Sequence, residues 1–339
     1  MRKKITVIAL LTVFVVVASM LTACVKETEE FKYKIIDEKS VEIVGVIDKD
    51  IETVEIPSQL AKRDVVGIAA KAFRECNNLT RVILPETVTY IGEKAFYKCA
   101  KLESIDLPDS VVSIGDSAFE ECRMLTNAKI GNGVTDIGEA AFANCYNLVR
   151  VTVGNSLQTI GARAFSHCEA LTAITLPNSI EAIEEGAFEY CRALAAATLG
   201  NSLQTLGDKA FYECSYLTAI VLPNSLTSLG KNAFSGCTDL TDVTLSSALT
   251  SISAGAFAFC NLNTVTISEK ITFIGSMAFS GCPLISVVFE NPNGWVCSFE
   301  FSGRREELTV NSSELTNVEN AAACLSDKYA GMDWQRTAD

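Results

Sequence analysis

Cysteine is the residue type with the widest chemical scope in this 339-residue chain, because a thiolate can bind metals, attack carbonyl carbons and form disulfides. The chain has 13 cysteines, and ten of them follow a phenylalanine by three residues in the motif Ala-Phe-x-x-Cys. These ten recur every 23 residues, with a last step of 22, at positions 76, 99, 122, 145, 168, 191, 214, 237, 260 and 282. A period of this length places one cysteine in every turn of a repeating chain.

The regular spacing argues against disulfides and metal sites within this series. Adjacent coils of stacked strands lie about 4.8 Å apart, and parallel side chains keep their Cβ atoms at that distance, beyond the usual range of about 3.5–4.5 Å for a disulfide. We therefore expect a column of buried, reduced thiols that act as small apolar residues. The chain has no Cys-x-x-Cys pair and a single histidine, His167, so a zinc site lacks ligands at local spacing. The sequence predicts no metal and no other cofactor. Cys297 and Cys324 lie outside the column, and a disulfide between them stays an open alternative.

His167 stands between Ser166 and Cys168, an arrangement that invites a Ser-His or Cys-His pair for nucleophilic catalysis. Cys168 belongs to the predicted buried column, however, and other repeats have residues such as Glu75 and Lys98 in the position of His167. We therefore expect His167 to be a variable, solvent-facing side chain.

The carboxylates and the glycines do not form catalytic motifs either. Glycoside hydrolysis needs two carboxyl groups that face each other across a cleft, whereas Glu103, Asp106 and Asp242 are isolated on predicted strands among threonine and alanine. The chain has no Walker phosphate-binding loop, and no Gly-x-Gly-x-x-Gly lies between a predicted strand and a predicted helix. The sequence thus predicts a protein that is not an enzyme.

The element that positions all these residues is the repeat itself. Each unit reads Leu-x-x-Ile/Val-x-Leu, then Pro or Gly, then a second apolar pair, Gly, and Ala-Phe-x-x-Cys. In Leu171 to Leu176 the apolar residues have the spacing of a short strand with a polar outer side. The Ala-Phe segment is too short for a helix of its own and is expected to form a helical or 3₁₀ turn. Stacked units of this kind form a solenoid with a phenylalanine core.

This consensus resembles the BspA-like subfamily of bacterial leucine-rich repeats, over about 235 of 339 residues and ten copies. The resemblance implies a right-handed, β-rich leucine-rich repeat solenoid with short helical or 3₁₀ turns. It also implies an exported or lipid-anchored cell-surface protein, since some members of the family are adhesins that bind host matrix proteins or other bacteria. It implies interaction rather than catalysis, and it does not fix a partner.

The first 24 residues have the features of an export signal: three basic residues, an apolar run over Ile5–Met20, and Leu-Thr-Ala-Cys24. The last four resemble a bacterial lipobox, which would make Cys24 the lipidated first residue of a protein on the outer face of a bacterial membrane. Two acyl chains are sufficient for stable anchoring. Ordinary cleavage and a retained spanning helix are the alternatives. Residues 25–30 are predicted to be a polar spacer.

The predicted boundaries of the folded part follow the loss of the repeat pattern at each end. Residues 31–56 alternate around a polar turn and predict a β-hairpin that serves as the N-terminal cap. Residues 57–289 are ten repeats of the leucine-rich type, and 290–339 form an irregular C-terminal cap or tail. Trp295 and Trp334 are interpreted as core residues of that cap, with a ligand platform as the alternative.

The charge balance excludes one class of partner. The net charge is −13, and removal of the leader with its three basic residues leaves 25 basic against 41 acidic residues, or −16. A protein that binds nucleic acid needs a basic stripe to displace counterions, and no such stripe occurs. The acidity is interpreted as a solubility feature. We expect a monomer with no nucleic-acid partner, which contacts a membrane only through its N-terminal lipid.

Two surfaces are candidate binding sites. One is a stripe of outward residues on the predicted strands that is rich in threonine; its candidate residues are Thr152, Thr175, Thr198, Val221 and Thr244. The other is the edge between the repeat Phe and Cys, with candidate residues Tyr190, Tyr212, Tyr216 and Phe259 and further aromatics at Tyr97 and Tyr146. Aromatic residues are enriched at interface hot spots. The alternatives are that β-branched residues suit exposed strands and that the rings pack between coils.

The sequence therefore predicts a lipid-anchored bacterial cell-surface protein that mediates protein–protein interaction or adhesion. A carbohydrate-binding surface protein without catalytic activity is the alternative, and it would need exposed, stacked tyrosines beside Asn or Asp. The sequence does not identify the ligand.

Overall fold

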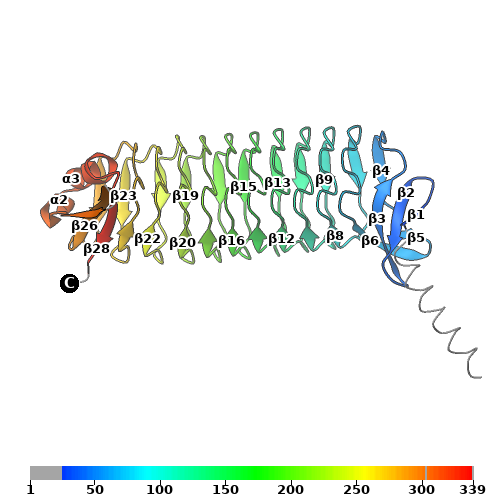
Figure 1. Cartoon of the computed structure of the whole chain (residues 1–339), viewed down its shortest axis with the longest axis horizontal. Helices are drawn as coiled ribbons and strands as arrows, with labels where there is room; N and C mark the ends of the chain where they lie inside the picture. Colours follow the sequence, from blue (N-terminus) through cyan, green and yellow to red (C-terminus); the bar gives the residue numbers. More distant parts are fainter. Residues whose placement is uncertain (1–24, 302–303, 338–339) are drawn as a thin grey trace, which may run out of the picture.

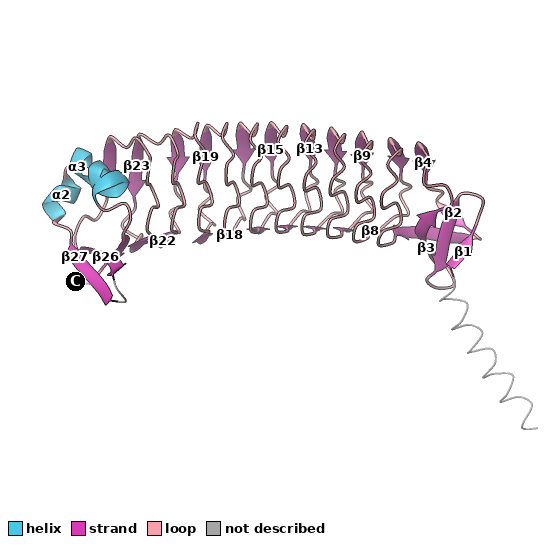
Figure 2. Ribbon diagram, turned by 45° about the horizontal axis from the view of Figure 1, so that its top comes forward, coloured by secondary structure: helices cyan, strands magenta, loops and turns pink. Residues whose placement is uncertain are grey.

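The computed structural model describes residues 25–301 and 304–337 of the chain. These residues form one elongated, gently curved rod in which about 11 coils are stacked side by side between a small N-terminal unit and a small C-terminal unit (Figures 1 and 2). The predicted solenoid is thus confirmed. Within the described residues, no helix has both the length and the apolar character needed to cross a bilayer.

Each coil contributes one strand to an upper series, which is the upper row in Figure 1. The strands of the upper series are β4 (Thr53–Glu55), β7 (Arg81–Ile83), β9 (Ser104–Asp106), β11 (Asn127–Lys129), β13 (Arg150–Thr152), β15 (Ala173–Thr175), β17 (Ala196–Thr198), β19 (Ala219–Val221), β21 (Asp242–Thr244), β23 (Thr264–Ile267) and β25 (Ser286–Phe289). In these strands the middle residue points inward and its two neighbours are exposed, as in β9 and β13. The upper series begins at Thr53, four residues before the predicted start of the array at residue 57.

The second strand of each coil belongs to a lower series on the opposite row of Figure 1. Its members are β6 (Arg63–Ile68), β8 (Tyr90–Ile91), β10 (Ser113–Ile114), β12 (Asp136–Ile137), β14 (Thr159–Ile160), β16 (Ala182–Ile183), β18 (Thr205–Leu206), β20 (Ser228–Leu229), β22 (Ser251–Ile252) and β24 (Phe273–Ile274). Most neighbouring strands within each series pair in parallel, and Ser104, Asn127 and Arg150 lie opposite one another. Residues that pair across neighbouring strands are therefore one sequence repeat apart. The pairing of the upper series is interrupted between β17 and β19 and between β21 and β23.

The register stacks identical side chains along the rod. The ten repeat phenylalanines, from Phe73 to Phe279, are buried. Each ring lies on the next with centroid separations such as 5.0 Å for Phe73 and Phe96 and 5.6 Å for Phe257 and Phe279. Neighbouring planes are nearly parallel, within 3° for Phe142 and Phe165. Because each ring fills the same place in consecutive coils, the core is one continuous column rather than a set of separate clusters.

The Ala-Phe segment forms turns with 3₁₀ spacing, such as the bond from the Ala95 N–H to the Gly92 carbonyl oxygen. It also contains left-handed residues that the sequence did not predict. Lys94 and Lys98 have φ of 54° and 60°, and the corresponding positions of the other repeats are also left-handed. This conformation turns their N–H groups toward the next coil, where they donate to the carbonyl oxygens of Asp116 and Glu120 at 2.9 and 2.8 Å. The inter-coil hydrogen bonds offset backbone strain of about 1–2 kcal/mol for each such residue.

The glycine after the lower strand is required by close approach rather than by φ. A Cβ on Gly161 would lie 2.8 Å from the carbonyl carbon of Gly138 in the preceding coil. Three repeats have another residue at this position, namely Ala69, Glu184 and Ser253, and the sequence predicts altered turns at Glu184 and Ser253. Glu184 keeps its inter-coil bond to the Ile160 carbonyl oxygen, and β16 and β18 remain paired. At Ser253 the side-chain hydroxyl donates to the Leu229 carbonyl oxygen, and the lower series is interrupted between β20 and β22.

The N-terminal unit extends the lower series. β2 (Phe31–Ile35) and β3 (Ser40–Val46) form the predicted antiparallel hairpin, and β3 then pairs in parallel with β6. A short strand β5 (Gln59–Leu60) also pairs with β6. The structure differs from the predicted spacer over residues 25–30, because Val25–Glu27 form strand β1, antiparallel to β2. The alternating Val-Lys-Glu pattern is short and polar, so composition alone did not reveal the strand.

The C-terminal unit comprises β26 (Trp295–Phe301), β27 (Arg304–Thr309), the short helices α2 (Ser312–Thr316) and α3 (Val318–Ala323), a π-helical turn η1 (Cys324–Lys328) and β28 (Asp333–Arg336). β28 pairs antiparallel with β24, the last strand of the lower series. The Asp333 carboxylate accepts from the Ser276 N–H at 2.7 Å, and the Ala330 carbonyl oxygen accepts from the left-handed Met277 at 2.6 Å. This unit supplies acceptors that a further coil would otherwise provide.

The two tryptophans lie in the interior of this unit. Trp295 and Trp334 are each 1% exposed and form edge-to-face contacts with Phe289 and with Tyr329, respectively. Their indole N–H groups donate to the carbonyl oxygens of Asn291 and Tyr329. Neither ring is exposed, so the core interpretation fits the structure and the ligand platform does not.

Candidate binding surfaces

The cysteine column has the properties of core thiols. All ten are buried and unbridged. From Cys99 onward, each Sγ donates to the carbonyl oxygen of the phenylalanine in the preceding coil, at 3.1 Å for Cys99 and Phe73 and 3.3 Å for Cys168 and Phe142. Burial raises the pKa of the Cys168 thiol well above its ordinary value, because the thiolate would be poorly solvated there. These thiols are therefore not poised for nucleophilic attack.

The two cysteines outside the column are also buried and unbridged in the C-terminal unit. Burial, with the neighbouring Cys324 as a smaller cause, raises the pKa of Cys297 to about 12. Within the described part of the chain, no cluster of three or more His, Cys, Asp or Glu side chains is arranged to hold a metal ion. Cys24 lies outside the described residues.

His167 is partly exposed and belongs to a row of rings on the Phe-to-Cys edge. Its imidazole stacks on Tyr190 at 4.6 Å, and Tyr190 meets Tyr212 edge to face at 5.5 Å. The Arg192 guanidinium lies 5.7 Å from the Tyr190 ring centroid. Tyr190 therefore has intramolecular partners on several sides, which favours a packing role for this row over a free recognition platform.

Two other candidate aromatic residues are more accessible, although Tyr216 follows Cys214 and so lies just beyond the Phe-to-Cys edge. Tyr216 is 60% exposed and Phe259 is 62% exposed. Phe259 is left-handed, with φ of 58°, and the same position of the coils on either side is occupied by Gly236 and Gly281. A Cβ on Gly281 would lie 2.6 Å from the Phe259 Cδ1 atom, so the ring covers this glycine. Tyr97, in an earlier coil, is instead flanked by the cations of Arg74 and Lys98.

The threonine stripe lies at the last position of the upper strands, exposed as predicted. Threonines one residue before the upper strands have a different environment, since the hydroxyls of Thr80 and Thr126 donate to carbonyl oxygens of the preceding coil. No hydroxyl of the stripe hydrogen-bonds to another described residue; these threonines are Thr152, Thr175, Thr198 and Thr244. We call the outward side of the upper series the upper face.

The upper face changes character along the rod. Near β17 and β19 it has a shallow hollow of about 290 Å³ lined by small or apolar residues that include Thr198, Ala219 and Val221. Val221 is 64% exposed there. Near β7 to β11 the face is charged: Asp106 and Lys129 form an ion pair at 2.9 Å, and both side chains are largely exposed.

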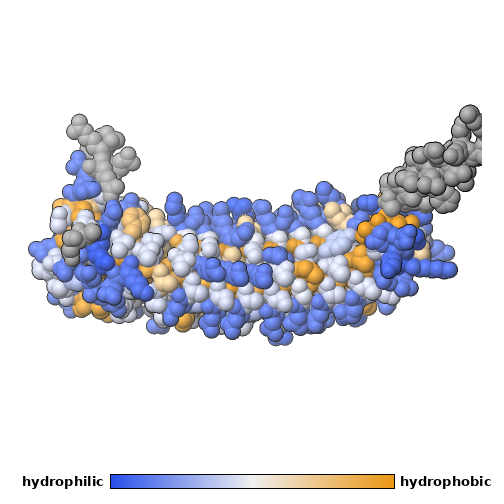
Figure 3. All heavy atoms as spheres, turned by 90° about the horizontal axis from the view of Figure 1, so that it is seen from below, coloured by the Kyte–Doolittle hydropathy of each residue, from blue (hydrophilic) through white to orange (hydrophobic). Residues whose placement is uncertain are grey.

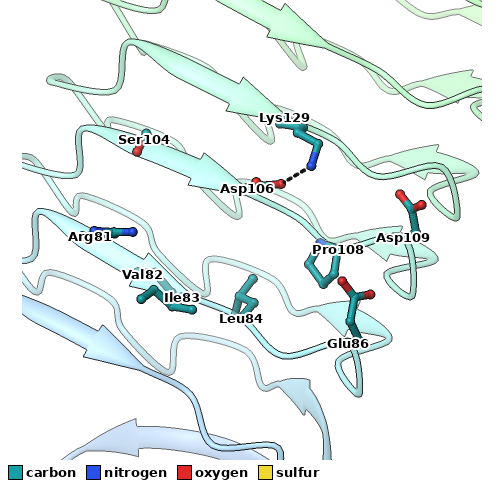
Figure 4. A pocket seen from close by; sticks show the side chains of 10 residues that line it. All are labelled: Arg81, Val82, Ile83, Leu84, Glu86, Ser104, Asp106, Pro108, Asp109 and Lys129. Atoms are coloured by element: carbon teal, nitrogen blue, oxygen red, sulfur yellow. Dashed lines mark ion pairs between the residues drawn. The ribbon is translucent and has the colours of Figure 1, made fainter.

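The charged part contains a larger hollow of about 480 Å³, shown in Figure 4. Arg81 and Ser104 lie at one end of it, and Glu86, Pro108 and Asp109 lie at the other. Val82, Ile83 and Leu84 form an apolar part between these ends, and the Asp106–Lys129 pair forms one side. This hollow is not visible in the sequence, because its residues come from three repeats and each occupies an ordinary variable position. The sequence does indicate that this part of the face differs, because Ile83, Asp106 and Lys129 stand where most later repeats have threonine.

The opposite side of the rod is mainly hydrophilic. In the view from below, hydrophilic side chains predominate and apolar ones are scattered among them (Figure 3). Exposed apolar residues there include Val112 on the approach to β10. Scattered exposed apolar side chains are normal on protein surfaces and do not mark an interface.

Comparison with known proteins agrees with the predicted resemblance. A family model described as the BspA type leucine-rich repeat region matches residues 48–172 and 158–286. Among solved structures, a leucine-rich repeat protein of T. pallidum is 34% identical, with a TM-score of 0.53, over 57% of this chain and 91% of that chain. One from Bacteroides ovatus is 29% identical, with a TM-score of 0.47, over 78% and 88%.

A pneumococcal vaccine antigen, PcpA, is 17% identical with a TM-score of 0.50, over 80% of this chain and 83% of that chain, and it supports the fold alone. No curated protein sequence matches this chain.

Proposed function

Because the chain belongs to the BspA-type leucine-rich repeat family, we propose that it is a bacterial cell-surface protein that binds a protein partner through its upper face. Solenoids of stacked repeats present extended surfaces of this kind. A lipid on Cys24 holds the protein at the outer face of the membrane, and binding to another cell or to host matrix gives it a role in adhesion.

The observation behind this proposal is the difference between the two kinds of threonine. Most threonines one residue before an upper strand donate their hydroxyl hydrogen bond to the preceding coil, as in the 3.0 Å bond from the Thr126 hydroxyl to the Glu103 carbonyl oxygen. Hydroxyls of the stripe, at Thr152, Thr175 and Thr198, have no partner among the described residues and face solvent at regular intervals. Such a surface offers donors and acceptors to a partner without breaking any bond of the fold.

The same arrangement favours binding over catalysis. The thiols are buried, and His167 is engaged with Tyr190. The proposal includes no enzymatic step and no cofactor, and the rod acts as a monomer.

Carbohydrate binding is the second candidate, and one residue favours it. Sugar rings stack on exposed aromatic faces beside polar side chains. Tyr216 is 60% exposed, and Asp239 occupies the same repeat position in the next coil, where its N–H donates to the Ser215 carbonyl oxygen.

The test compares binding of two lysine variants of residues 25–339. In the first, Thr152, Thr175 and Thr198 become Lys, which adds three charges to the upper face. In the second, Thr159, Ala182 and Thr205 become Lys, which adds the same charges to the lower series of the same coils. Purified matrix proteins and a glycan array are the probes. We expect saturable binding to a protein, with about ten-fold or greater loss in the upper-face variant only.

Both variants should melt like the parent protein, because all six positions have accessible side chains. Saturable binding to glycans but to no protein would favour the second candidate. Equal binding by the two variants would contradict the assignment to the upper face.

A further inference from the structure

The hollow over β7 to β11 differs from the rest of the upper face in its charge and in its shape. Its volume of about 480 Å³ lies within the range of about 300–1,000 Å³ that is usual for ligand sites. One end of the hollow has the cation of Arg81, the other has the carboxylates of Glu86 and Asp109, and the part between them is apolar. An extended chain with charged side chains therefore fits in one direction only. We propose, on the basis of the proposed function, that this hollow binds an extended peptide segment of a partner protein that has a basic side chain a few residues from an acidic one, with an apolar side chain between them.

The basic side chain is selected by the end of the hollow where two carboxylates lie. Glu86 has no ion-pair or hydrogen-bond partner among the described residues. Asp109 accepts from the Asn132 N–H at 2.8 Å, and this bond holds the pKa of its carboxyl below the usual range. The Asp109 carboxyl is therefore ionised at neutral pH, and the nearby Lys129 ammonium forms its ion pair with Asp106 rather than with Asp109 or Glu86. An arginine or lysine placed between Glu86 and Asp109 gains charge-assisted hydrogen bonds.

The apolar side chain is selected by Ile83, which stands where most later repeats have threonine. Ile83 is 42% exposed, and Leu84 beside it is half-buried. Pro108 lies across from them in the next coil (Figure 4). An aliphatic group placed on Ile83 and Leu84 buries apolar surface of both the ligand and the protein.

The acidic side chain is selected at the other end by Arg81, which has no partner among the described residues either. Arginine recognises carboxylates through two parallel hydrogen bonds. Arg81 and Glu86 are five residues apart on a largely extended segment, so they are separated by at most about 17 Å. An extended ligand covers this span when its charged residues are four positions apart, at about 13 Å, with the remaining distance supplied by their side chains.

The probe is an immobilised peptide with the core Asp-Gly-Leu-Gly-Arg between Gly-Ser spacers. Two comparison peptides replace its Arg by Glu or its Leu by Ser. The protein is residues 25–339, and the decisive variant is Glu86→Lys, which changes a side chain without partners. Glu181→Lys is the matched control: it makes the same charge change at an exposed glutamate elsewhere on the rod. A second variant, Ile83→Thr, installs the residue that other repeats have at this position.

We expect the parent protein and Glu181→Lys to bind the probe about ten-fold more tightly than either comparison peptide. Glu86→Lys should lose about ten-fold for the probe and gain preference for the Glu-containing peptide. Ile83→Thr should remove the difference between the Leu and Ser peptides. Equal peptide binding by Glu86→Lys and Glu181→Lys would overturn the inference.

The same variants distinguish this inference from the proposed function. If Glu86→Lys leaves partner binding intact while the three upper-face lysines abolish it, the inference fails and the proposed function stands. If neither change affects a bound partner, both assignments fail.

Discussion

At the scale of single residues, the chain uses reactive groups for packing. Ten thiols lie in the core, and each has its pKa raised. Burial is the largest cause for all of them except Cys260, for which the hydrogen bond with Cys237 is larger. Cysteine suits this place because it is small, apolar and able to donate weakly to the carbonyl oxygen of the preceding coil.

The thiol column predicts that the protein loses stability in alkaline solution. In the unfolded chain each thiol ionises near its ordinary pKa of 9.0, whereas the folded state keeps it protonated. Below that pH the folded and unfolded states bind the same number of protons at these thiols, so the thiols do not make the free energy of unfolding depend on pH. Above it only the unfolded state releases them, and the free energy of unfolding falls by about 1.4 kcal/mol per pH unit for each buried thiol.

Urea denaturation between pH 7 and pH 10.5 measures this effect. A variant with Cys145, Cys168 and Cys191 changed to Ala should have a slope above pH 9 that is shallower by about 4 kcal/mol per pH unit. Identical slopes for the variant and the parent would show that other groups cause the alkaline loss.

At the scale of the elements, most of the coil could be predicted from the sequence and one part could not. The period, the phenylalanine stacking and the inward residues of the strands follow from patterns that repeat in every unit. The left-handed positions do not, because Lys94, Ser117 and Ala140 occupy one of them without a common residue type. The one indication in the sequence is that two other repeats have glycine at this position, Gly186 and Gly255, since glycine adopts a left-handed conformation without strain.

The left-handed positions predict opposite effects for two reciprocal substitutions. Ala140 has φ of 53°, and Gly186 occupies the same repeat position with φ of 61°. Ala140→Gly should stabilise the fold by about 0.5–1 kcal/mol, since glycine adopts this conformation without strain. Gly186→Ala should destabilise it by about 1 kcal/mol, because alanine is strained in the left-handed conformation. Steric overlap should add little, since the atom nearest to the new Cβ is at the flexible end of the Glu189 side chain, at 3.0 Å.

Chemical denaturation of both variants checks the pair. Gly230→Ala is the contrasting control, because its Cβ would lie 2.2 Å from the Gly207 carbonyl carbon and the expected cost is about 1–3 kcal/mol. Destabilisation by Ala140→Gly would contradict the strain argument.

At the scale of the whole molecule, the rod has two different ends, and the candidate site could be predicted only in outline. The stripe was visible as a threonine pattern, whereas the hollow near Ile83 depends on which variable residues meet across coils. The same holds for strand β1, whose pairing with β2 depends on the hairpin that follows it. Strand β1 begins at Val25, the residue directly after Cys24.

This position gives the anchor a structural consequence. If the diacylglycerol is attached to Cys24, no spacer separates it from β1, and the N-terminal unit lies next to the membrane. Cells that express the full chain should incorporate an alkyne-labelled fatty acid into the protein, since two acyl chains give stable anchoring. Cys24→Ser should abolish the label, and Cys297→Ser, which changes a buried cysteine at the other end, should retain it. Equal labelling of both variants, or a mature N-terminus other than residue 24, would contradict lipidation at this cysteine.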